Sequence, residues 1–156
     1  MSPQKSILLI TLGLIFTATA PEVNAQKMYW TTGTFESIER ANLDGSDVEI
    51  VIPGTDPDYP RGMALDLGAG QMYWTDSGND KIRRAGFDGS NSQDLVSGVN
   101  ALGIALDLSH SKMYWTESGP NKIRRADLDG TNIEDLVTTE ESAQGIALDP
   151  DGGKMY

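Results

Sequence analysis

Three aspartates recur at the same place in a repeated segment, and together they could bind a divalent cation. Asp66, Asp107 and Asp149 each end a Gly-x-Ala-Leu-Asp segment. Calcium takes roughly six to eight oxygen ligands, and carboxylates are among those it prefers. Each aspartate also precedes a turn, where its carboxylate can accept backbone hydrogen bonds or pair with an arginine. Because a single active site would break a repeat, we expect all three to be structural, with calcium binding as the alternative.

Few other residues offer chemistry. The chain has no cysteine, which excludes thiolate zinc sites and thiol nucleophiles. Its single histidine, His110, lies in a serine-flanked turn without a recurring partner, and we expect a surface residue. Asp76 and Glu117 each close a Tyr-Trp segment, and we expect structural roles for both. We therefore expect no catalytic residue, no cofactor and no enzymatic activity.

A sequence repeat sets the spacing of these residues. A Met-Tyr-Trp-Thr segment starts at Met28, Met72 and Met113, and a fourth copy begins at Met155, so the spacing is 41 to 44 residues. A fixed period in this range indicates a repeat architecture. We assign the repeats to residues of about 26–70, 71–111 and 112–153, with the start of a fourth at 154.

Each repeat contains four short apolar segments separated by Gly and Asp, which favours strands over helices. In chain order they are Gly-x-Ala-Leu-Asp, Met-Tyr-Trp-Thr, Ile-x-Arg-Ala and a segment of Asp-Leu-Val type. An Asp-Gly pair precedes the last segment in every repeat, at residues 44–45, 88–89 and 129–130. This pair predicts a tight hairpin turn.

Large side chains occupy both faces of the second segment. Met72 and Trp74 alternate with Tyr73 and Thr75, and successive strand residues point to opposite faces. A strand that is apolar on both sides belongs to a sheet packed between two neighbours. The pattern therefore predicts blades of a β-propeller.

The segments Tyr73–Asp76, Ile82–Ala85, Asp88-Gly89 and Gly103–Asp107 together resemble the low-density-lipoprotein receptor class B repeat, or YWTD repeat. The resemblance covers essentially all of residues 27–156. It implies a propeller closed by six repeats, with the Tyr-Trp strand second in its blade and the Gly-x-Ala-Leu-Asp strand innermost. The expected fold class is all-β, a partial six-bladed-type propeller of about three four-stranded antiparallel blades. The structural motif residues would be Tyr29, Trp30, Tyr73, Trp74, Asp76, Tyr114, Trp115, Glu117, Asp66, Asp107 and Asp149.

The sequence departs from the family pattern in three ways. The first and third copies end in Thr32 and Glu117 rather than aspartate, cysteine-rich flanking modules are absent, and three repeats stand where six are expected. Two explanations are open. The chain is a fragment of a longer receptor-like or matrix-like protein, or it forms a homodimer that completes a six-bladed ring. In the homodimer each copy would give its last strand, Gln144–Asp149, to the first blade of the other.

Residues 1–25 have the layout of a secretory signal peptide. Lys5 precedes an apolar run from Ile7 to Phe16, and Val23-Asn24-Ala25 precedes the expected cleavage site. The apolar run is shorter than the roughly 17–25 residues of a membrane-spanning helix. Residues 26–156 would then be secreted and extracellular, or periplasmic in a bacterium. The net charge of −11 argues against nucleic acid and anionic membranes as partners.

Departures from the repeat are the better guides to a ligand site. The longest is the acidic, proline-rich loop at 53–60, which enters an innermost strand. It is expected on the same propeller face as the turns at 77–80 and 118–121. A ligand surface there would use Tyr59 as an anchor. The candidate residues are Asp56, Asp58, Tyr59, Asn79, Asp80 and Asn121.

The resemblance implies a secreted, non-catalytic module that binds an extracellular protein or peptide. The alternative is a propeller enzyme of lyase or lactonase type whose active site lies largely on blades that this sequence lacks. Clustered histidines and acids near the axis of the full ring would favour the enzyme.

Overall fold

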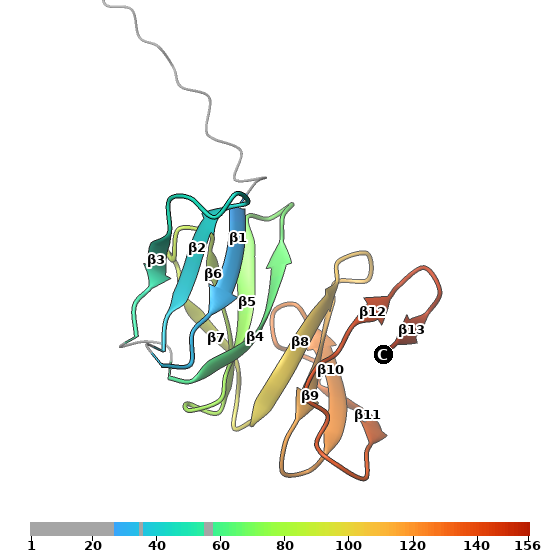
Figure 1. Ribbon diagram of the computed structural model, residues 1–156. Helices are drawn as coiled ribbons and strands as arrows, with labels where there is room; N and C mark the ends of the chain where they lie inside the picture. Colours follow the sequence, from blue (N-terminus) through green and yellow to red (C-terminus); the bar gives the residue numbers. More distant parts are fainter. Residues whose placement is uncertain (1–26, 35, 55–57) are drawn as a thin grey trace, which may run out of the picture.

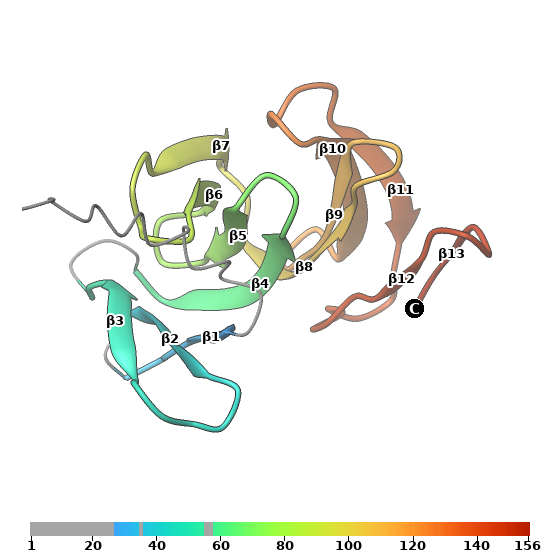
Figure 2. The same cartoon turned by 90° about the horizontal axis from the view of Figure 1, so that it is seen from above.

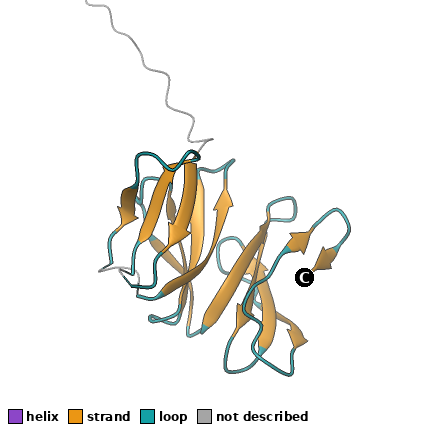
Figure 3. Cartoon of the chain, in the orientation of Figure 1, coloured by secondary structure: helices purple, strands orange, loops and turns teal. Residues whose placement is uncertain are grey.

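The computed structural model describes residues 27–34, 36–54 and 58–156. The expected signal peptide and Asp56 lie outside them. The regular structure of the described residues is entirely β-strand (Figure 3), and none of these residues forms a helix that could span a membrane.

Three sheets and a hairpin follow one another along the chain (Figure 1). The first blade contains β1 (Lys27–Thr31), β2 (Ile38–Asn42) and β3 (Glu49–Ile52). The second blade contains β4 (Pro60–Asp66), β5 (Gln71–Asp76), β6 (Lys81–Gly86) and β7 (Gln93–Ser97). The third blade contains β8 (Ala101–Asp107), β9 (Lys112–Glu117), β10 (Lys122–Asp127) and β11 (Glu134–Thr138). The C-terminal hairpin contains β12 (Leu148–Asp149) and β13 (Lys154–Met155).

Strands in each sheet are antiparallel and in sequence order, with β4 and β8 innermost and β5 and β9 second. The predicted all-β partial propeller with four-stranded antiparallel blades is therefore confirmed. The hairpin lies beside the third blade, at the other end of the row from the first blade (Figure 2). The strand expected over Gln144–Asp149 is shorter than predicted and covers only Leu148–Asp149, because its partner β13 spans only Lys154–Met155.

The strand β5 is buried on both faces. Met72 and Trp74, each 0% exposed, pack with Ile38 and Ile52 of the first blade. Tyr73, on the opposite face, packs in a second cluster with Trp115 of the third blade. Each blade is thus held by the apolar faces of its neighbours, as the alternating large residues predict.

Innermost strands of adjacent blades are joined through threonine and glycine. The Thr75 hydroxyl accepts a hydrogen bond from the Gly62 amide at 2.9 Å and donates one to the Leu102 carbonyl at 2.8 Å. A Cβ on Gly62 would lie 2.5 Å from that carbonyl oxygen. The glycine of the Gly-x-Ala-Leu-Asp segment therefore permits the close approach of two backbones.

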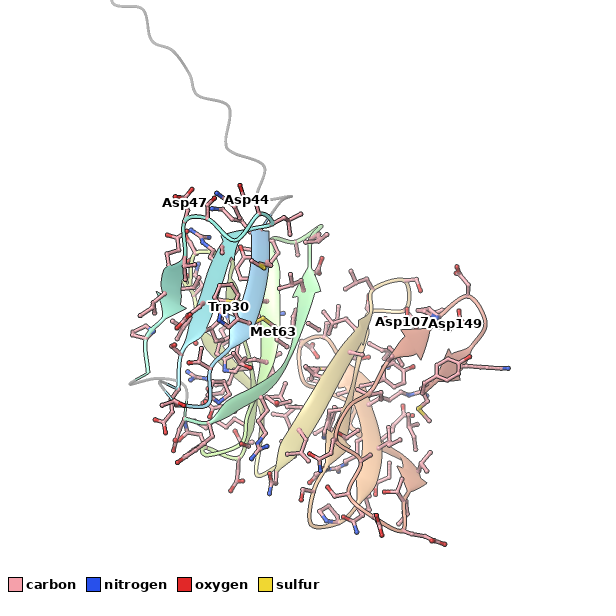
Figure 4. The ribbon with its side chains drawn as sticks, in the orientation of Figure 1. Trp30, Asp44, Asp47, Met63, Asp107 and Asp149 are labelled. Atoms are coloured by element: carbon pink, nitrogen blue, oxygen red, sulfur yellow. The ribbon has the colours of Figure 1, made fainter. Side chains whose placement is uncertain are left out.

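The first blade leaves part of its outer face open. Trp30 on β1 (Figure 4) is only half-buried, and Met28 is 37% exposed, although Trp74 and Met72 occupy the same places in β5. Trp30 is therefore less completely packed than Trp74. Among the described residues no blade precedes the first, and none of them covers this face.

Ion pairs join the outermost strand of a blade to the adjacent strand of the same blade. Asp94 on β7 accepts a hydrogen bond from Lys81 at 2.6 Å and lies 2.9 Å from the Arg83 Nε. The bond from Lys81 is the main cause that lowers the pKa of Asp94. Lys122 likewise lowers the pKa of Asp135 on β11. Both aspartates are partly exposed, so water screens these pairs.

Replacing Trp74 by alanine should lower the free energy of unfolding by about 3–5 kcal/mol, because it removes a fully buried indole. Replacing Trp30 should cost clearly less, because its side chain already contacts water. Urea unfolding followed by circular dichroism measures both. Equal losses for the two variants, or no loss for Trp74→Ala, would contradict the packing described.

Acidification from about pH 5 to about pH 3 should destabilise the protein. The lowered pKa values mean that the folded chain binds protons only at lower pH than the unfolded chain does. The stability from these carboxylates is present above the unfolded pKa and lost as pH falls through the folded one. In urea unfolding across this range, the double variant Asp94→Asn/Asp135→Asn should lose less free energy of unfolding than the unchanged protein. Identical pH profiles for the two proteins would refute the assignment.

Candidate functional site

The candidate ligand face is the edge of the second and third blades where β4 begins and β5 and β9 end. The loop leading into β4 lies against the β5–β6 turn. The Gly78 amide donates to the Asp58 carbonyl at 2.9 Å, and both the amide and the hydroxyl of Ser77 donate to the Tyr59 carbonyl, at 3.2 and 2.9 Å. The backbone of this loop is therefore fixed by the turn.

A buried carboxylate anchors this junction. Asp76, 0% exposed, accepts hydrogen bonds from the Asp58 amide at 3.1 Å and from the Asn79 side chain at 3.1 and 3.2 Å. The Arg83 guanidinium lies 3.4 Å from the same carboxylate and 5.5 Å from the centre of the Trp74 ring. The charge is thus paired and hydrogen-bonded, as a buried carboxylate requires.

The third blade repeats this arrangement. The Glu117 carboxylate lies 3.0 Å from Arg124, which stacks 5.9 Å from the centre of the Trp115 ring. In the first blade Thr32 and Glu39 stand in the corresponding positions, and the Ser37 hydroxyl bonds to both side chains, at 2.9 and 3.1 Å. The missing acid at Thr32 is therefore accompanied by a missing arginine.

The sequence-predicted candidates divide by what their side chains do. The Asn79 side-chain amide donates a hydrogen bond to Asp76. The backbone carbonyl of Asn121 accepts one from the Thr139 amide at 2.8 Å. Asp80 and Tyr59 are exposed, Tyr59 by 52%, and both have positive φ angles of 53° and 49°. Such a φ is uncommon for a bulky residue such as tyrosine, whereas aspartate adopts it more readily. Asp58 is half-buried through its contacts with the turn.

A hollow of about 670 Å³ opens along the innermost strands next to Tyr59. It is lined by residues of β4, β8 and the segment before β12, including Arg61, Leu102 and Gln144. Arg61 is exposed, and its Nε donates to the Ser77 hydroxyl at 3.0 Å. The sequence reasoning missed Arg61 and Gln144. The signal was present, since Arg61, Leu102 and Gln144 hold one repeat position with three different side chains.

The three recurrent aspartates cap turns at the opposite edge, where Figure 4 shows Asp107 and Asp149. Asp66 accepts from the Ala69 amide at 2.9 Å, Asp149 from the Gly152 amide at 2.9 Å, and Asp107 from the His110 amide at 3.2 Å. The Ser109 hydroxyl is the main cause that lowers the pKa of Asp107. The described residues contain no group of three or more His, Cys, Asp or Glu side chains placed to hold a metal ion.

Among solved structures, a nidogen domain resembles the chain in both fold and sequence. Nidogen in a crystal structure of a nidogen/laminin complex superimposes with a TM-score of 0.78 at 32% identity, over 83% of this chain and 51% of that chain. The chain thus spans about half the length of this relative. A comparison with the curated proteins gives no match.

More distant propellers share the fold. A putative TolB from Agrobacterium tumefaciens has a TM-score of 0.63 at 16% identity, over 74% of this chain and 46% of that chain. A gluconolactonase from Xanthomonas campestris has a TM-score of 0.59 at 20% identity, over 76% and 39%. At such identities the likeness shows the fold alone.

The sequence profile described as low-density lipoprotein receptor repeat class B matches residues 70–108 and 111–150. The first stretch covers β5 to β8 and the second covers β9 to β12, so each match holds the three outer strands of one blade and the innermost strand that follows it. With the nidogen likeness, they show that the chain belongs to the YWTD-repeat β-propeller family.

Proposed function

We propose that this chain is a non-catalytic recognition module that binds an extracellular matrix protein of laminin type through the ligand face. Nidogen, in complex with laminin in its solved structure, supplies the partner class. The observation that carries the proposal is the exposed pair Tyr59 and Arg61 at the mouth of the 670 Å³ hollow.

The chemistry of this pair suits protein recognition. Tyrosine and arginine are enriched among residues that dominate binding energy, because each offers a large rigid surface together with hydrogen-bonding groups. Tyr59 is 52% exposed, yet its backbone is tied to Ser77 by two hydrogen bonds. A partner would therefore meet a tyrosine whose backbone is already fixed, which lowers the entropy lost on binding.

The alternative of a lactonase or lyase propeller has weaker support. It rests on neighbours that share only the fold, such as the gluconolactonase at 20% identity. In the described part of the chain, the acids that recur are engaged in caps and ion pairs. No specific observation favours this second function.

The double variant Tyr59→Ala/Arg61→Ala should bind a laminin fragment at least about tenfold more weakly than the unchanged protein, because hot-spot truncations typically cost more than 1 kcal/mol. Biolayer interferometry with the immobilised fragment measures the dissociation constants.

Leu67→Ala is the matched control. Leu67 is 67% exposed in the β4–β5 turn, at the edge opposite the ligand face, and its loss should leave binding unchanged. Absence of laminin binding by the unchanged protein, or equal effects of the two changes, would overturn the proposal.

We also infer that residues 1–25 direct export and are removed. The proposal predicts that the protein recovered from the medium of expressing eukaryotic cells begins at Gln26. N-terminal sequencing of the recovered protein tests it. A secreted protein that still begins at Met1, or retention of the chain in the cell, would refute the inference.

A further inference from the structure

The row of blades ends in two open faces with unlike residues. On the first blade, Leu43 is 66% exposed, whereas Phe87 at the same place in the second blade is 7% exposed. On the third blade, Val137 is 38% exposed, whereas Val96 and Ile52 at the same place are 4% and 6% exposed. A face that is covered within the row is therefore uncovered at each end.

An arginine links each blade to the next. The Arg40 Nη1 of the first blade donates to the Phe87 carbonyl of the second at 2.8 Å, and the Arg84 Nη1 of the second donates to the Leu128 carbonyl of the third at 3.3 Å. Arg125, in the same place on the third blade, bonds to Glu134 of its own blade at 2.8 Å. Among the described residues no next blade offers it a carbonyl. The matching carbonyl position, the residue before Asp-Gly, is Leu43 at the other end of the row.

The Asp-Gly turns make a second repeated contact. A Cβ on Gly89 would lie 2.5 Å from the Val51 carbonyl of the preceding blade, and one on Gly130 would overlap the Leu95 carbonyl in the same way. Gly45 in the first blade has nothing within 4 Å. Leu136 of the third blade holds the position of Val51 and Leu95, and so has the carbonyl that would meet a glycine such as Gly45. Leu136 lines a hollow of about 490 Å³.

The innermost strands make a third repeated contact between blades. A Cβ on Gly62 would meet the Leu102 carbonyl at 2.5 Å and one on Gly103 the Gln144 carbonyl at 2.9 Å, whereas Gly145 has nothing within 4 Å. Each of the three contacts is made twice inside the chain. For each contact, one of its two residues also recurs without the other at one end of the row, on the third blade or the hairpin. The missing residue recurs at the opposite end, on the first two blades.

The hairpin carries the strand that the first blade lacks among the described residues. Leu148 pairs with Met155 as Leu65 pairs with Met72 in the second blade. The hairpin strand Lys154-Met155-Tyr156 has the same sequence as Lys27-Met28-Tyr29 at the start of β1. The register by which β12 would pair with β1 of a first blade is therefore already present in the hairpin.

We propose that a second copy of this chain closes the ring. The open face of the third blade in each copy seats the first blade of the other, and β12 pairs with the partner's β1 in place of its own β13. Two equal interfaces result, related by a two-fold axis, so the assembly closes and does not extend into a filament. The closure goes beyond ligand binding and is independent of what the ligand face binds.

Light scattering coupled to size exclusion tests the proposal on the purified protein, and the expected mass is that of two chains. Leu43→Asp should raise the dimer dissociation constant at least about tenfold, because it places a carboxylate against the apolar residues of the partner's third blade. Leu67→Asp, equally exposed but in the second blade, is the matched control and should dimerise normally. A folded monomer, a larger assembly, or equal effects of the two changes would overturn the proposal.

Cross-linking tests the pairing of unlike faces. Val51 and Phe87 pack in one cluster, so Leu136 of one copy should lie near Leu43 of the other. The chain has no cysteine of its own. On oxidation, a mixture of Leu43→Cys and Leu136→Cys proteins should form mainly disulfides between the two variants. Disulfides formed only between two copies of the same variant would show that like faces meet and would refute the arrangement.

Discussion

The packing of one strand between two sheets holds the structure together. From β5, Met72 and Trp74 enter the apolar cluster shared with the first blade, and Tyr73 enters the one shared with the third. Thr75 on the same strand joins the innermost strands of the second and third blades through its hydroxyl. Because one strand serves both interfaces, a blade without a neighbour exposes large side chains. The half-buried Trp30 and the exposed Leu43 follow from this constraint.

The same strand also positions the ligand face. Asp76 ends β5 and is fully buried, so its carboxylate can bond at once to the incoming loop, to the following turn and to Arg83. The repeated residues thereby build a rigid frame, and the residues that depart from the repeat, Tyr59 and Arg61, are displayed on it. This division explains how a repeat protein can vary its partner without altering its fold.

The fold could be predicted from the sequence because the residues that form each contact between blades recur in every repeat. The order of strands and the two apolar faces of β5 follow from periodicity, and the family follows from the Tyr-Trp, Ile-x-Arg-Ala and Asp-Gly segments. The site was less accessible. Asp76 pairs with Arg83 and not with Arg84 of the recurring Ile-x-Arg-Ala segment, because adjacent arginines on a strand face opposite ways. The exposure of Trp30 depends on a neighbouring blade, which local sequence does not encode.

Closure of the ring and recognition at its face both require that β5 stays locked between its neighbours. Hydrogen exchange of the β5 backbone amides, measured in increasing urea, tests this most directly. We expect these amides to exchange only through unfolding of the whole array, with an opening free energy equal to that of global unfolding. Exchange of β5 through a smaller local opening, while the remaining blades stay folded, would contradict the account.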